Sequence, residues 1–232
     1  MISISLYKIY RFFCFTILGL TVANLTVQIA RFTLPLDRQS SIYRLLNVNN
    51  EANIPTWYST IALLVCVLLL ALIAILKKRQ GDRFIYHWRG LVLLFLLLSL
   101  DEAASLHEKL NAPIRSLLDL DSNGLFLWVI PGSIFASTIA LIYWKFLSSL
   151  PPQTRNLILQ SAALYLGGAI GFELFTAFLV WNISDLHPTM VVLTIAIEEL
   201  LEKLGILTFI RALLLYIGVN FPAVRIHFVE KN

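Results

Sequence analysis

The sequence predicts an all-α integral membrane protein, a bundle of six transmembrane helices with both termini in the cytoplasm. Of its 232 residues, 58% are hydrophobic and 14% are charged, whereas soluble domains carry about 25% charged residues. A chain this apolar cannot cover a water-facing surface, so its solvent must be lipid. The apolar residues also fall into six runs, each near the ~20 residues that a helix needs to cross a bilayer. We therefore expect one integral membrane domain over residues 1–232.

The first three predicted helices cover about 10–30, 57–76 and 88–109. The first follows Lys8 and Arg11 and so resembles a signal peptide. Its apolar run is longer than a signal core, and no clear small-residue cleavage site follows it. We therefore predict that it is a retained span.

The last three predicted helices cover about 125–148, 156–181 and 188–218. The sixth begins at Pro188, a residue suited to the first turn of a helix. The fifth carries small residues at a four-residue spacing, which predicts a closely packed face. That stripe consists of Ala163, Gly167 and Gly171. The longest predicted loops cover about 31–56 and 110–124.

The distribution of lysine and arginine predicts the orientation, because cytoplasmic loops carry an excess of both. A cytoplasmic N-terminus puts the densest basic segment, KKRQGDR at 77–83, on the cytoplasmic side. The other basic residues on that side would be Lys8, Arg11, Arg89, Lys145, Arg155, Arg225 and Lys231, against Arg31, Arg38, Arg44, Lys109 and Arg115 outside. The net charge of +4 follows from this bias, so we expect no nucleic-acid partner. We place the protein in the lipid bilayer of a bacterial plasma membrane.

Seven acidic residues and one histidine lie within the third, fifth and sixth predicted helices. An ionisable group at the centre of a membrane helix costs ~2.5–3.5 kcal/mol on insertion scales. These groups must therefore face one another, water or a bound ion. They are Asp101, Glu102, His107 and Glu108 on the third helix, Glu173 on the fifth, and Glu198, Glu199 and Glu202 on the sixth.

Helical geometry predicts which of these side chains share a face. At ~100° per residue, Asp101, Ser105 and Glu108 fall on one face of an unbroken third helix, and His107 points the other way. Counting ~1.5 Å per residue places Asp101 near the bilayer midplane and His107 nearer the outer surface.

The acids of the sixth helix form one stripe, in which Glu198 and Glu199 lie at the depth of Asp101 and Glu202 lies somewhat deeper. Glu198, Glu199 and Glu202 lie within about 100° of one another. Lys203 follows Glu199 at the i, i+4 spacing of a salt bridge. We therefore expect the acids of the third and sixth helices to converge in a polar funnel that opens to the outside.

The leading hypothesis is a metal-dependent enzyme embedded in the membrane, acting on a lipid-like substrate. Facing carboxylates with a histidine suit a hard or borderline divalent cation, which would be the cofactor. Neither the E-x-x-H nor the H-E-x-x-H pattern occurs, so di-iron bundles and zincins are not indicated. The predicted metal ligands are Asp101, Glu102, Glu198, Glu199 and Glu202, and the catalytic groups are His107, Glu108 and Glu173.

Two alternatives use the same cluster. The first is a transporter of protons or small divalent cations. It is favoured by a five-residue likeness between 106–110 and 200–204, which would fit inverted repeats. The second is a non-catalytic scaffold in which the polar groups only fix helix packing. The inner third of the sixth helix offers only Thr208 and Arg211, and this lack of a polar path favours the enzyme.

Overall fold

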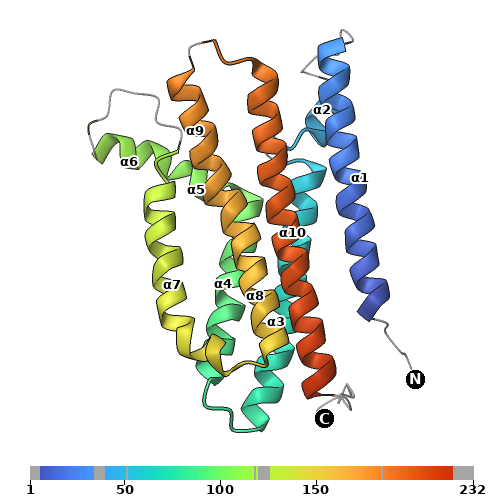
Figure 1. The fold of residues 1–232 in the computed structure, drawn as a ribbon, viewed down its shortest axis with the longest axis vertical. Helices are drawn as coiled ribbons and strands as arrows, with labels where there is room; N and C mark the ends of the chain where they lie inside the picture. Colours follow the sequence, from blue (N-terminus) through green and yellow to red (C-terminus); the bar gives the residue numbers. More distant parts are fainter. Residues whose placement is uncertain are drawn as a thin grey trace, which may run out of the picture.

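The structure is a computed structural model that describes residues 6–33, 40–50, 52–117, 119, 126–183 and 185–221. Within these ranges every regular element is a helix and no strand occurs, so the all-α prediction is confirmed. Among the described residues, four helices are long and apolar enough to cross a membrane, or five if the bent pair Ile85–Ala104 and Leu106–Leu117 forms one span. Figure 1 shows the long helices aligned along one axis of the molecule. This arrangement is consistent with a membrane protein.

Four of the predicted spans are single helices, and two, 88–109 and 156–181, are interrupted. The elements are α1 (Leu6–Thr33), α2 (Ser41–Leu46), α3 (Ile54–Arg79), α4 (Ile85–Ala104), α5 (Leu106–Lys109), α6 (Asn111–Leu117), α7 (Val129–Ser149), α8 (Pro152–Leu166), the π-helix η1 (Gly167–Phe172), α9 (Glu173–Asn182) and α10 (Pro188–Asn220). The short helices α2 and α6 lie in stretches predicted to be loops. The first turn of α1 and the last turn of α10 lie at the same end of the bundle (Figure 1).

The helix α10 is the central helix of the bundle and contacts α1, α3, α8 and α9. It begins at Pro188, as predicted. Its C-terminal half packs into an apolar core whose most deeply buried members include Leu70 and Ile73 of α3 and Ile210 and Leu213 of α10. The half of the bundle near the chain ends is therefore filled with hydrocarbon side chains, and the acids lie in the other half.

The third predicted helix, 88–109, is wrong as a single helix. It breaks at Ser105, which adopts the left-handed conformation with φ 46° and ψ 49°, and the chain bends by 71° between α4 and the pair α5–α6. His107 is thereby turned back towards Asp101. The predicted shared face of Asp101, Ser105 and Glu108 does not exist, because a left-handed residue interrupts the 3.6-residue period.

We expect Ser105→Val to lower the free energy of unfolding by about 1–2 kcal/mol, because β-branched residues are poorly accommodated at positive φ. Ser105→Gly should be tolerated, since glycine adopts this conformation without a steric penalty. Thermal unfolding of both variants in detergent measures the difference. If both variants unfold at the wild-type temperature, Ser105 is not held in the left-handed region.

The predicted stripe of small residues, Ala163, Gly167 and Gly171, is wrong as the face that contacts α10, because a second irregularity interrupts the helix. Residues 167–172 form a π-helix, which adds a residue to the turn and rotates the contact face. Gly168, and not Gly167, packs against α10: a Cβ there would lie 2.7 Å from the Glu198 carbonyl oxygen and 2.9 Å from Glu202 Cγ. A Cβ on Gly167 would meet nothing within 4 Å, and Ala163 is exposed.

Gly168→Ala should therefore destabilise the bundle by about 1–3 kcal/mol, the usual range for overpacking. The matched control is Gly167→Ala, one residue away on the same π-helix. It should be neutral or slightly stabilising, because alanine disfavours the unfolded chain relative to glycine. The measurement is the unfolding midpoint of the two variants in the same detergent. Equal midpoints would contradict the packing of Gly168 on α10.

Candidate functional site

The centre of the site is a pair formed by Asp101 and His107 across the helix break. The His107 backbone N–H donates to Oδ1 of Asp101 at 2.8 Å, and His107 Nδ1 lies 2.9 Å from Oδ2. An ionised carboxylate can only accept, so Nδ1 carries the proton in this contact. Both oxygens of one carboxylate thus fix the backbone and the ring of the histidine. The Nε2 atom is the ring position that remains for chemistry.

This pair remains accessible. The His107 side chain is 32% exposed and that of Asp101 is 29% exposed. One face of the His107 ring is covered by Trp128, with ring centroids 4.7 Å apart. A reactant can therefore reach the imidazole, while an aromatic side chain restricts its rotation.

Trp128 connects the pair to the acids of α9 and α10. Its indole N–H donates to Oε1 of Glu173 at 3.1 Å, and its backbone N–H donates to Oδ1 of Asn111 at 2.9 Å. The Glu173 carboxyl in turn interacts electrostatically with the carboxyl of Glu198. A continuous set of polar contacts therefore runs from the start of α7 to the middle of α10.

The remaining acids gather round one lysine. Lys203 forms a salt bridge with Glu199, as the i, i+4 spacing predicted, and its side chain is 3% exposed. Glu102 interacts electrostatically with Glu199 and Lys203. Glu202 interacts with Glu102, Glu199 and Lys203. The structure thus brings acids of α4 and α10 together around a single buried cation.

Two backbone irregularities place these side chains. The left-handed Ser105 turns His107 onto Asp101, and the π-helix ends where Glu173 begins α9. Strained residues and π-bulges occur preferentially at functional sites. Both irregularities lie next to members of one polar cluster, which makes this cluster the candidate functional site.

Sequence reasoning missed two members of the site. Trp128 contacts both His107 and Glu173, and Tyr165 of α8 interacts electrostatically with Glu102 and Glu202. An aromatic residue in an apolar helix carries no pattern that separates a site residue from a packing residue. Glu108, which was predicted to be a catalytic group, has an exposed side chain and interacts electrostatically with His107.

The predicted metal ligands do not form a ligand set in this arrangement. Among the described residues, no three acidic, histidine or cysteine side chains are grouped so that they could hold a metal ion. Asp101 is engaged by His107, and Glu199 by Lys203. Elemental analysis of the purified protein, wild type against Glu198→Gln, tests the predicted cation directly.

The predicted likeness between the two halves has no structural counterpart. Residues 106–110 form a short helix after a break, whereas 200–204 lie in the middle of the long α10. Equivalent positions of an inverted repeat would share a local structure.

Comparison with known proteins gives a family without an assigned activity. Residues 13–217 match a family described as Domain of unknown function (DUF8692). No curated protein and no solved structure matches the chain significantly. A function for the chain therefore follows only from the residues of its site.

Proposed function

The chain belongs to the DUF8692 family, and we propose that it is a membrane-embedded enzyme in which His107 is the general base acting on an amphipathic, lipid-like substrate. The observation that carries the proposal is the double contact of Asp101 with the backbone and ring of His107. A base whose proton-bearing nitrogen is held by a third group is the arrangement that general-base catalysis requires.

The chemistry assigned to each group follows from its contacts. His107 would take a proton at Nε2 from water or from a substrate hydroxyl, and Asp101 would stabilise the imidazolium that results. Glu173, held by the indole of Trp128, lies on the same side of the bundle and would return a proton to the leaving group. Glu173 would enter this step protonated, and the step would leave His107 protonated and Glu173 ionised. Transfer of one proton from Nε2 of His107 to Glu173 through water would then restore both groups before the next turnover.

A site inside the bilayer is reached by lipids and other amphipathic molecules, and this is the reason for proposing a lipid-like substrate. We place six crossings at α1, α3, α4, α7, α8–α9 and α10, with the chain ends in the cytoplasm. The last of these is 33 residues long, which at ~1.5 Å per residue exceeds the ~30 Å of the bilayer core. The acidic residues of α10 lower the mean hydropathy of this helix, but Glu198 and Glu202 interact with other polar groups inside the bundle.

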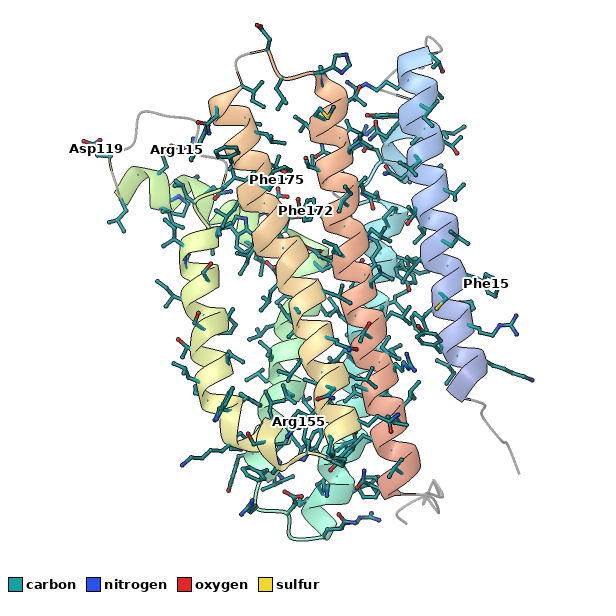
Figure 2. All side chains as sticks on the ribbon, in the orientation of Figure 1. Phe15, Arg115, Asp119, Arg155, Phe172 and Phe175 are labelled. Carbon is teal, nitrogen blue, oxygen red and sulfur yellow. The ribbon has the colours of Figure 1, made fainter. Side chains whose placement is uncertain are left out.

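The position of His107 suggests approach from the membrane surface. Helix α6 leaves the bundle sideways next to the start of α7 (Figure 1), and its exposed Leu117 is 84% accessible. Figure 2 shows Arg115 of α6 and Arg155 of α8 at opposite ends of the bundle. Helices α5 and α6, which follow the 71° bend after α4, therefore suit the interface between head groups and acyl chains, where the polar part of a lipid lies.

A turnover assay on mixed lipids tests the proposal. Purified protein in nanodiscs is incubated with a lipid extract, and the products are identified by mass spectrometry. We expect the wild type to form a product that His107→Asn does not form. His187→Asn is the matched control, because His187 caps α10 through a backbone contact that asparagine can also make. A product formed equally by all three proteins overturns the assignment of His107.

One observation favours a second candidate, a proton transporter. The facing carboxyl groups of Glu173 and Glu198 could bind and release a proton between α9 and α10. A transporter needs a polar path through the other half of the bundle, and that half is occupied by apolar residues such as Ile210 and Leu213. Proton uptake by proteoliposomes that is lost in Glu198→Gln, together with no lipid product, would support the transporter in place of the enzyme.

A further inference from the structure

A basic groove lies on the outside of the bundle, at the end where α3 stops and α4 begins. It is open to the outside, offers about 330 Å³ of space to water-sized molecules, and is lined by Ala71, Ala74, Ile75, Lys78, Arg89 and Val92. None of these residues belongs to the site around His107. The groove is therefore a separate feature with its own chemistry.

The spacing of the lining residues gives the groove a polar and an apolar end. The residues of α3 recur at i, i+3, i+4 and i+7, which is one helix face. Because α3 and α4 are antiparallel (Figure 1), Lys78 and Arg89 meet at the end of the bundle, while Ala71 and Val92 lie deeper. Lys78 and Ala71 are separated by about 10 Å along the helix at 1.5 Å per residue. The short alanine side chains leave this length open.

Both cations of the groove are exposed and lack an acidic partner. Neither Lys78 nor Arg89 forms a salt bridge within the part of the chain that the structure describes, whereas the adjacent Lys77 pairs with Asp82 at 3.1 Å. The Arg89 guanidinium lies 6.0 Å from the ring of Tyr86 on its own helix. Two unpaired cations at the mouth of an apolar groove favour an anion that carries a hydrocarbon chain.

We propose that this groove binds an anionic phospholipid, with its phosphate between Lys78 and Arg89 and an acyl chain along Ala71, Ala74 and Val92. Lysine and arginine are the side chains that recognise phosphate. Basic pockets between transmembrane helices bind acidic head groups. A zwitterionic head group would bring its own cation towards Lys78 and Arg89, so the groove discriminates in favour of phosphatidylglycerol. The inference rests on the proposed membrane location and is independent of any role of His107.

Native mass spectrometry of the purified protein, titrated with phosphatidylglycerol or phosphatidylcholine, tests the groove. We expect the wild type to retain phosphatidylglycerol preferentially. Lys78→Gln and Arg89→Gln should each weaken its retention about fivefold, the effect of one basic residue near an acidic lipid. Ala71→Leu keeps both charges but fills the floor, and it should also weaken retention.

The control removes two cations outside the groove. Lys145→Gln combined with Arg155→Gln changes the charge at the same end of the bundle, where α7 ends and α8 begins (Figure 1), and should leave retention unchanged. Equal loss in this control and in the Lys78→Gln, Arg89→Gln double variant would overturn the proposal. So would equal retention of the two lipids, or displacement of phosphatidylglycerol by inorganic phosphate, which would show that no acyl chain is needed. His107→Asn should bind like the wild type, which separates this inference from the enzymatic one.

Discussion

Lys203→Met should lower the free energy of unfolding by about 3–5 kcal/mol, the cost of leaving a buried charge without its partner. Lys203 is 3% exposed and forms a salt bridge with Glu199. It is also within electrostatic range of Glu102 and Glu202. Methionine has a similar length but no charge, so the variant removes the one cation around which three acids gather. The loss is measured as a change in the unfolding midpoint in detergent.

The double variant Lys203→Met, Glu199→Gln separates charge from packing. If the cost is the uncompensated carboxylate, the double variant should unfold closer to the wild type than the single variant does. Lys145→Met is the control, because Lys145 is exposed and surface substitutions usually stay within about 0.5 kcal/mol. A Lys203→Met variant as stable as Lys145→Met would show that Lys203 does not compensate the acids.

Composition and hydropathy were sufficient to predict the all-helical fold, because apolar runs are a local property of the chain. The start of α10 at Pro188 and the pairing of Glu199 with Lys203 followed from local rules and are confirmed. The approach of acids from the third and sixth predicted helices could also be anticipated, since charged groups in an apolar bundle have few alternatives to one another. The prediction placed a divalent metal ion between them, whereas in the structure they gather round Lys203.

The details of the site could not be read in the same way. Ser105 is neither glycine nor proline, so no local signal predicts a left-handed residue there. The break brings His107 onto Asp101, and an unbroken helix would prevent that contact. The π-helix similarly shifts the contact from Gly167 to Gly168, and a period of 3.6 residues cannot anticipate the extra residue.

Asp101→Asn should lower kcat by about 10²- to 10⁴-fold, the range for general acid–base catalysis. Asp101 is a positioning residue: its two oxygens accept from the backbone N–H and from Nδ1 of His107. Asparagine has one oxygen, so one of these two donors loses its acceptor. The ring can then turn, or take the other tautomer, and Nε2 no longer faces the reactant as a base. KM should change little, because Asp101 is assigned no contact with the substrate.

The matched control for this change is Asp82→Asn at the other end of the bundle. Asp82 also uses both oxygens, accepting from the Phe84 backbone N–H at 2.7 Å and pairing with Lys77 at 3.1 Å, but it lies outside the site. It should keep the wild-type kcat per folded molecule, with the folded fraction measured by size-exclusion chromatography. Asp101→Glu restores two acceptor oxygens on a longer side chain and should recover part of kcat. If Asp101→Asn keeps kcat within about threefold of the wild type, or if Asp101→Glu is as inactive as Asp101→Asn, then orientation of His107 by a carboxylate is not the source of catalysis.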